Sequence, residues 1–315
     1  MLWLAGLMGL MAVSAVAYVD IGSDDEDESE NSLATPQEND SINLIIGTEA
    51  SDAIGGTENS DRISGLGGDD VIYANDGDDQ VRAGAGNDTV AGGLGNDVIA
   101  GQDGNDDLLG GDDDDDLAGH NDDDVIFGND GDDKLNGSAG DDYLFGGAGS
   151  DQMHGGLGND FVSGGAGKDL LFGGFGDDTI DGVMGETLAG TQDTSTTEYL
   201  NGGAGDDLLI AGALDVVTAG EGSDQITLGD WIVGSDSAEV LDFTPEEDSL
   251  LFVWDDSVPD ATEPDVTVTP NSDSESTFEI RLGDQIVAQV HSDAPMSALD
   301  ISLIPLSSAQ TLGLG

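Results

Sequence analysis

The chain has 315 residues, of which 68 are acidic and 5 are basic, giving a formal net charge of −63 at pH 7. This charge excludes nucleic acids and anionic membranes as electrostatic partners and favours cations. The absence of cysteine excludes a disulfide framework, cysteine-ligated zinc and a thiol nucleophile. Asp outnumbers Glu by 53 to 15 and 50 residues are glycine, which indicates turns and oxygen ligands rather than a generic acidic surface.

The N-terminal residues 1–19 are apolar except for Ser14. As a helix they would be about 28 Å long, close to the hydrocarbon thickness of a bilayer, so we expect a hydrophobic helix that anchors the chain in a membrane. A secretory signal is the alternative, because Ala15-Val16-Ala17 fits a small-residue cleavage site. Residues 20–46 follow as an acidic linker that the composition predicts to be disordered.

Residues 47–181 consist of fifteen successive nine-residue units, written G-G-x-G-x-D-x-U-x, with no insertion or deletion. Position six is Asp in every unit, from Asp52 to Asp178, and position eight is aliphatic or Met in every unit. Position one is Gly in thirteen units. A phase held over 135 residues indicates a repeat architecture.

Each unit combines a turn and a strand. The G-G-x-G-x-D stretch is predicted to form the turn, because glycine permits positive φ and lets successive carbonyls point at one spot. Carbonyl and carboxylate oxygens are the ligands that Ca²⁺ prefers. The remaining x-U-x is predicted to be a three-residue strand whose apolar central side chain faces the core.

A single unit cannot bury its strand, so neighbouring units must stack. Two units would form one coil, giving two parallel sheets with turns along both edges and at most 13 gaps between stacked turns. Residues 47–181 carry 33 acidic and 4 basic side chains, a net charge of −29 that full calcium loading nearly neutralises. We therefore expect the array to fold when calcium binds.

This pattern resembles the RTX (repeat-in-toxin, haemolysin-type) family of calcium-binding repeats. The resemblance covers Gly47 to Asp181 and resumes at Gly202 to Leu209. It implies an all-β fold, a parallel β-roll, to which we add a small C-terminal β domain and the N-terminal hydrophobic helix. It also implies that the position-six carboxylates and the turn carbonyls ligate calcium. The residues concerned are Asp70, Asp79, Asp88, Asp97, Asp106, Asp115, Asp124, Asp133, Asp142, Asp151, Asp160, Asp169, Asp178 and Asp207, with Gly93, Gly95, Gly147, Gly149, Gly156, Gly158, Gly165, Gly167, Gly174 and Gly176.

Some turns depart from the pattern. The first two, which end at Asp52 and Asp61, lack the second and third glycines and are predicted to cap the roll without binding metal. Asp113 and Asp122 replace Gly at position four, where the backbone conformation is demanding, so their sites are expected to be altered or weak. The expected calcium count is therefore below 13.

Aromatic side chains gather at the outward positions seven and nine. Phe127, Tyr143, Phe145 and Phe161 belong to alternate units and should stack on one face. They are either exposed strand formers or a strip on which another segment or a partner docks.

The C-terminal part is less regular. Residues 182–201 break the phase and are predicted to form a loop insert, and residues 202–233 contain degenerate units. Residues 234–315 alternate in polarity and are predicted to form a small β domain that caps the roll. The family resemblance implies type I secretion as an export route.

Rival sites find little support. Asp169 follows Gly167-Lys168 where a phosphate-binding loop needs Ser or Thr, and no H-E-x-x-H motif is present. The sequence therefore predicts a non-enzymatic, calcium-dependent extracellular or envelope protein with a structural or adhesive role. Two alternatives remain open: the accessory part of a secreted toxin or hydrolase, and a module that binds a cell-surface polysaccharide through Trp231 and Trp254.

Overall fold

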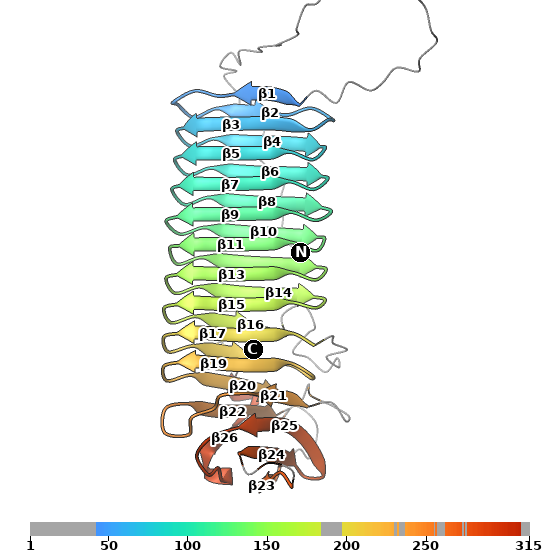
Figure 1. The fold of residues 1–315 in the computed structure, drawn as a ribbon, viewed down its shortest axis with the longest axis vertical. Helices are drawn as coiled ribbons and strands as arrows, with labels where there is room; N and C mark the ends of the chain where they lie inside the picture. Colours follow the sequence, from blue (N-terminus) through green and yellow to red (C-terminus); the bar gives the residue numbers. More distant parts are fainter. Residues whose placement is uncertain are drawn as a thin grey trace, which may run out of the picture.

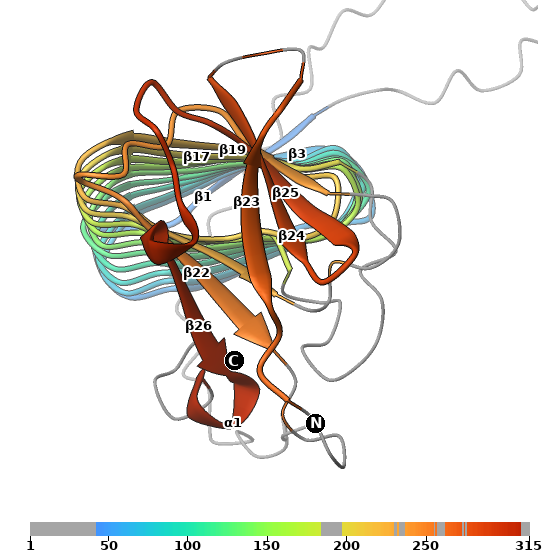
Figure 2. The ribbon, with the colours of Figure 1, turned by 90° about the horizontal axis from the view of Figure 1, so that it is seen from below.

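The computed structural model describes residues 42–183, 197–229, 232, 237–254, 256, 262–272, 274 and 276–309. These residues form a tall stack of strands, and up to residue 254 each strand pairs with one two places along the chain (Figure 1). Seen along the stack, the coil is flattened, with a sheet on each broad face and turns at both narrow edges (Figure 2). This arrangement confirms the predicted parallel β-roll.

The two sheets have 14 and 12 strands in the described residues. The 14-stranded sheet contains β1 (Asn43–Ile46), β3 (Asp61–Gly67), β5 (Gln80–Ala85), β7 (Val98–Asp103), β9 (Asp116–Asn121), β11 (Lys134–Ala139), β13 (Gln152–Leu157), β15 (Leu170–Phe175), β17 (Tyr199–Ala204), β19 (Val216–Glu221), β21 (Ala238–Val240), β25 (Gln285–His291), β24 (Thr277–Leu282) and β23 (Val266–Pro270). The 12-stranded sheet contains β2 (Ala53–Gly55), β4 (Val71–Asp76), β6 (Thr89–Leu94), β8 (Asp107–Asp112), β10 (Val125–Asp130), β12 (Tyr143–Ala148), β14 (Phe161–Ala166), β16 (Thr179–Asp181), β18 (Leu208–Ile210), β20 (Gln225–Gly229), β22 (Ser249–Trp254) and β26 (Ile301–Pro305).

The strand register confirms two units per coil. Ile126 of β10 lies opposite Leu144 of β12, which is 18 residues further along the chain. Both side chains occupy position eight and are fully buried between the sheets. A fully buried side chain of this size contributes about 1.5–3 kcal/mol, so the row of position-eight residues forms the core that holds successive coils together.

The strands are longer than predicted. β6 covers x-U-x and continues through both glycines of the next motif, with Gly93 opposite Gly111 and Leu94 opposite Asp112. The prediction of a three-residue strand and a six-residue turn was wrong, because the first half of the glycine-rich stretch continues to pair with the neighbouring coil. The turn proper occupies positions four to six.

The predicted N-terminal hydrophobic helix is corrected. Residues 1–19 lie outside the described residues, and no helix within the described part is long and apolar enough to cross a membrane. The helical segments there are the short η1 (Ala298–Asp300) and α1 (Leu306–Ala309) near the C-terminal end. The described residues therefore form an all-β roll, and no N-terminal helix is among them.

The boundary between linker and roll also shifts. Residues 43–46, assigned from sequence to the acidic linker, form β1 and pair in parallel with β3. Ile45 lies opposite Ile63, and both are buried. The apolar Leu44-Ile45-Ile46 stretch adds a first half-coil, which the repeat motif did not reveal because no glycine-rich turn precedes it.

The C-terminal strands extend the same two sheets. β21 and β25 continue the 14-stranded sheet, β22 and β26 continue the other, and β24 and β23 add an antiparallel end (Figure 2). Phe243 and Val290 belong to one continuous hydrophobic core with the roll. Trp254 is partly buried against this core, whereas Trp231 lies outside the described residues.

Candidate metal sites between stacked turns

Each position-six aspartate lies at the start of a strand and forms hydrogen bonds with the neighbouring coil. For example, Oδ1 of Asp97 accepts the backbone N–H of Asp79 at 2.8 Å, and the Asp97 N–H donates to Oδ1 of Asp115 at 2.8 Å. The same contact repeats along both edges, so the position-six residues form two aspartate ladders parallel to the roll axis. One carboxylate oxygen of each residue is thus committed to holding the backbone.

The second carboxylate oxygen is left over. Within the described part of the chain, Oδ2 is buried and accepts no hydrogen bond in the aspartates of thirteen successive units and in two later ones. They are Asp70, Asp79, Asp88, Asp97, Asp106, Asp115, Asp124, Asp133, Asp142, Asp151, Asp160, Asp169, Asp178, Asp207 and Asp224. Burying a carboxylate oxygen without a partner is costly, so a ligand for these atoms is implied.

The unpaired oxygens face backbone carbonyls. A β-carbon built on Gly92 would collide with Oδ2 of Asp97 and lie 2.7 Å from the carbonyl oxygen of Gly110, one coil further on. At Gly92 a larger side chain would therefore enter the gap between two stacked turns. Among the described residues, no three acidic or imidazole side chains converge on one point. A cation in the gap would draw most of its ligands from carbonyls, and this oxygen-rich donor set fits Ca²⁺.

Glycines two and four of each turn have the left-handed backbone that the turn needs. Gly93 has φ of 128° and Gly95 has φ of 111°. A β-carbon at Gly93 would also collide with the carbonyl oxygen of Asn75 in the preceding coil. The same left-handed conformation is found at Gly147, Gly149, Gly156, Gly158, Gly165, Gly167, Gly174 and Gly176.

Burial raises the pKa values of the position-six carboxyl groups in the two aspartate ladders. Removal from water raises the pKa of Asp124 to about 8; the charges of Asp106 and Asp142 add to the rise, and the hydrogen bond from the Asp106 N–H opposes it. Burial likewise raises the pKa of Asp97 to about 7. Without a cation, the position-six carboxyl groups near neutral pH are therefore either protonated or ionised at a large cost in free energy.

The first two turns, which lack the second and third glycines, differ in the hydrogen bonds of their aspartates. Oδ2 of Asp52 accepts the N–H of Thr48 at 2.6 Å, and Oδ2 of Asp61 accepts the N–H of Thr57 at 2.6 Å. Each carboxylate is thus satisfied within its own turn. That these turns close the end of the roll without binding a metal stays a prediction.

The two substituted turns have the predicted backbone. Asp113 and Asp122 take the place of glycine four with φ of 78° and 68°. Non-glycine residues in this region are uncommon, although Asp is among those that tolerate it best. Weaker calcium binding at these turns stays a prediction.

Some ladder positions escaped the sequence pattern. Glu198 is buried directly before β17, and its N–H donates to Oδ1 of Asp215, as a position-six residue would. The nine-residue pattern does not identify Glu198, because Glu stands where the pattern has Asp and an insert interrupts the phase. Oδ2 of Asp215 accepts the N–H of Gly212, and Oδ2 of Asp248 accepts that of Thr244, so both resemble the self-satisfied first turns.

The histidine with the most polar contacts holds the C-terminal strands together. Nδ1 of His291 lies 3.2 Å from the Thr277 hydroxyl, and Nε2 lies 3.0 Å from Oε1 of Glu239. The contacts join β24, β25 and β21. The Thr277 side chain is buried, which suits a structural tie rather than a nucleophile that a substrate must reach.

A family model for the RTX calcium-binding nonapeptide repeat matches residues 55–185 and 194–226, in several overlapping copies. These segments amount to just over half of the chain. The chain belongs to this RTX repeat family. The unpaired ladder oxygens lie within the matched segments, and the RTX repeats bind calcium.

Comparison with solved structures gives a weaker likeness. The chain is similar to the extracellular lipase LipA from Serratia marcescens, with 13% sequence identity and a TM-score of 0.22. The match covers 70% of this chain and 45% of the lipase chain, so the chain spans less than half the length of that enzyme. A likeness at this level carries no argument about function. No curated protein matches the chain.

The predicted aromatic strip lies on the outer face of β10, β12 and β14. The rings of Phe127 and Phe145 stack at 4.9 Å between centroids, and Phe145 contacts Phe161 at 5.6 Å. Phe127 is 36% exposed and Tyr143 is 52% exposed, so part of the strip faces solvent while its rings contact one another across adjacent coils.

Replacing Phe145 and Phe161 together by serine is expected to leave the calcium count and affinity unchanged, because both rings face away from the turn edges. Stability should fall by about 1–3 kcal/mol, since each ring pair contributes about 0.5–1.5 kcal/mol beyond its buried area. Calorimetric calcium titration and thermal unfolding of the double variant measure the two effects. A lower calcium count would show that the strip supports the metal sites as well.

Proposed function

We propose that this chain is a non-enzymatic extracellular or cell-envelope protein whose roll folds as calcium enters between stacked turns. The observation that carries the proposal is the row of buried Oδ2 atoms without hydrogen-bond partners, most of which lie beside a carbonyl oxygen of the next coil. A cation bound to these oxygens replaces the water that folding removes from them. Binding and folding are then one equilibrium.

Charge supports the same mechanism. Residues 47–181 have a net charge of −29, and self-repulsion of this size opposes compaction unless counter-ions are bound. Calcium sites of extracellular modules have Kd values of about 10⁻⁴–10⁻³ M. A roll with such sites stays loose at low calcium and folds where calcium is millimolar, which suits a structural or adhesive role outside the cell.

Calcium titration of the chelated full-length chain, followed by circular dichroism and calorimetry, tests the proposal. We expect the β-sheet signal to grow cooperatively with calcium, with fewer than 13 ions bound in the main array of residues 47–181. Magnesium at the same concentration serves as the control, because its demand for near-octahedral geometry fits a carbonyl-lined gap poorly. An unchanged spectrum on adding calcium would disprove the coupling.

A further inference from the structure

Two arginines lie side by side on an outer sheet face without an acidic partner. Arg62 of β3 donates from Nε and Nη2 to Oε1 of Gln80, at 3.2 and 3.0 Å. Within the described residues, the salt bridges are Arg281 with Glu279 and His291 with Glu239, so neither Arg62 nor Arg82 pairs with a carboxylate. In a chain with 68 acidic residues, two guanidinium groups on neighbouring strands have no carboxylate partner and are available to an external anion.

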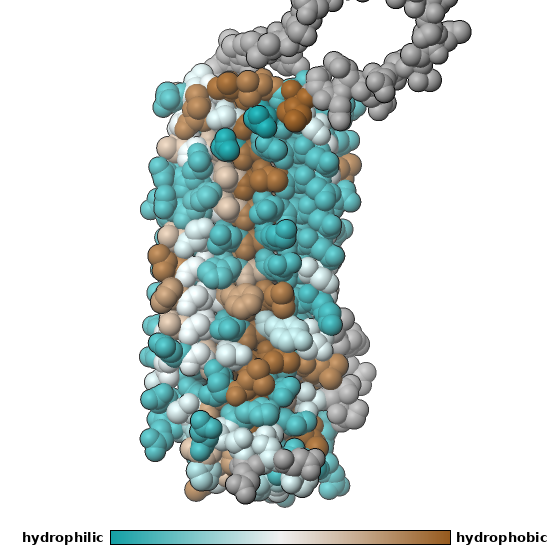
Figure 3. Space-filling view, in the orientation of Figure 1, coloured by the Kyte–Doolittle hydropathy of each residue, from teal (hydrophilic) through white to brown (hydrophobic). Residues whose placement is uncertain are grey.

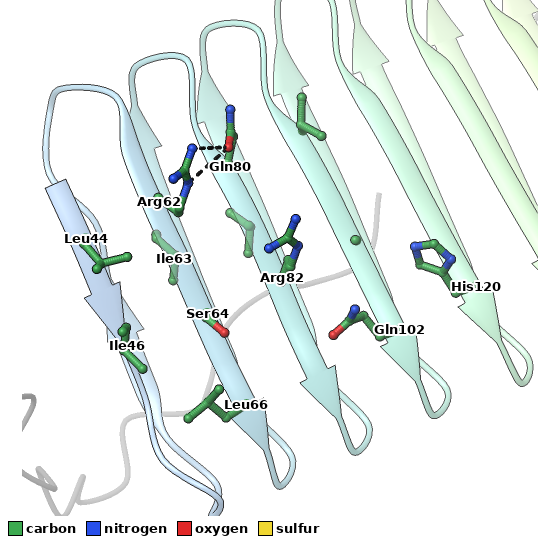
Figure 4. Close-up of a pocket in the computed structure, with 13 residues that line it drawn as sticks. Leu44, Ile46, Arg62, Ile63, Ser64, Leu66, Gln80, Arg82, Gln102 and His120 are labelled. Atoms are coloured by element: carbon green, nitrogen blue, oxygen red, sulfur yellow. Dashed lines mark hydrogen bonds between the residues drawn. The ribbon is translucent and has the colours of Figure 1, made fainter. Parts of the chain in front are cut away.

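These arginines border a groove of about 550 Å³ on the outer face of β1, β3, β5, β7 and β9 (Figure 4). The walls include Leu44 and Ile46 on one side and Val98 on the other. All three side chains are 40–49% exposed. On the sheet face in Figure 3, hydrophobic side chains follow the middle and hydrophilic ones follow both flanks. The acidic turns thus flank the groove, and cations and aliphatic side chains line it.

Three non-glycine residues at position two of their turns line the same groove. Leu66, Gln102 and His120 take the place of glycine two, with φ of 82°, 93° and 87°. Leucine and glutamine seldom adopt this conformation, so each costs free energy that glycine would not. The turn imposes the conformation, since Asn75, Asn129 and Ser138 adopt it outside the groove. In the groove it places three side chains along one hollow.

We propose that this groove binds a single-chain fatty-acid anion, with its head group between Arg62 and Arg82 and its chain along Leu44, Ile46 and Leu66. Guanidinium groups bind carboxylates through paired, charge-assisted hydrogen bonds. The walls among the described residues contain no Phe, Tyr or Trp on which a sugar ring could stack. A free monomer is favoured over a bilayer surface, because the chain's charge of −63 repels an anionic membrane.

Calorimetric titration of the full chain at saturating calcium tests the groove. Decyl sulfate below its micelle concentration is the probe, because carboxylate soaps precipitate with calcium. We expect the double variant with Arg62→Gln and Arg82→Gln to bind at least tenfold more weakly. Lys134→Gln, on the same sheet face but outside the groove, is the matched control and should bind like the parent chain. Decanol and inorganic sulfate, the two halves of the probe, should each bind too weakly to measure.

Leu66→Gly separates ligand binding from folding. The glycine relieves the positive-φ strain and removes the apolar wall, so we expect equal or higher thermal stability together with severalfold weaker binding of decyl sulfate. A variant that binds normally would show that Leu66 is not part of a binding surface.

Three other results would overturn the proposal. One is equal binding by the double arginine variant and the parent chain, with the fold verified by circular dichroism. Another is binding of decanol as tight as that of decyl sulfate. The last is binding to anionic phospholipid vesicles without binding of monomeric decyl sulfate, which would assign the surface to a membrane.

Discussion

Asp142→Asn, in the middle of the roll, is expected to remove at least one calcium ion and to raise the calcium concentration at half-folding about tenfold, equivalent to about 1.4 kcal/mol. Asparagine retains the Oδ1 atom that accepts the N–H of Asp124 at 2.8 Å. It replaces Oδ2, which lies beside Gly137 and the Gly155 carbonyl, with an uncharged amide nitrogen. The substitution therefore removes the metal ligand while leaving the ladder contact in place.

Asp61→Asn is the matched control for that experiment. Asp61 holds the same place in its unit, and its N–H donates to Oδ1 of Asp79, but its Oδ2 already accepts the N–H of Thr57. We expect the calcium count to stay unchanged, with a loss of about 1–3 kcal/mol from the broken contact at the end of the roll. Calorimetry gives the counts, and chemical unfolding gives the stability. Equal calcium counts for Asp142→Asn and the parent chain would show that Oδ2 is not a ligand.

The position of the substitution adds a second readout. In a stacked repeat each coil contacts only the two coils beside it. The free energy of unfolding is then approximately the sum of contributions from the coils and from the interfaces between them. A defect at Asp142 divides the roll into two halves, and unfolding should broaden or separate into two steps. A defect at Asp61 shortens one end and should leave a single transition.

Periodicity was sufficient to predict the repeat core. The nine-residue phase placed Ile126 and Leu144 inside and set the 18-residue register that the structure confirms. Missing glycines also separated the first two turns from the rest. These features depend on the local pattern of each unit, and that pattern is repeated often enough to be read without a structure.

Contacts between coils could not be predicted in the same way. Sequence reasoning treated each position-six Asp as a ligand alone, whereas Oδ1 holds the next backbone and Oδ2 remains for the metal. Strand length was underestimated since the motif does not show that Gly93 pairs with Gly111. Both features depend on a partner in another coil. The role of Asp215 was hidden for a different reason, because its carboxylate is satisfied by Gly212 within its own shortened turn.

Acidification of the calcium-free chain is expected to increase its β-sheet content, opposite to the usual effect of acid on a protein. Burial raises the folded-state pKa of Asp124 to about 8 and that of Asp142 to about 7, whereas an unfolded Asp has a pKa near 3.9. The folded state therefore binds more protons than the unfolded state between these values. Its stability without calcium is highest below the unfolded pKa and is lost as the pH rises through about 6–8.

Calcium reverses the direction of this pH dependence. Because the cation binds the ionised carboxylates, it displaces protons from the calcium-free fold that acid stabilises. The apparent calcium affinity should therefore rise from pH 5 to pH 8, and the number of protons released should fall as the calcium-free chain becomes ionised and loose. Calorimetry in buffers of different ionisation enthalpy measures the protons released, and circular dichroism at pH 5 and 8 follows the calcium-free fold. Repeating the comparison in 1 M salt isolates the buried groups, since a Debye length of about 3 Å screens the exposed charges. If the calcium-free β signal is no larger at pH 5 than at pH 8, protonation of the ladder does not stabilise the roll, and this prediction is wrong.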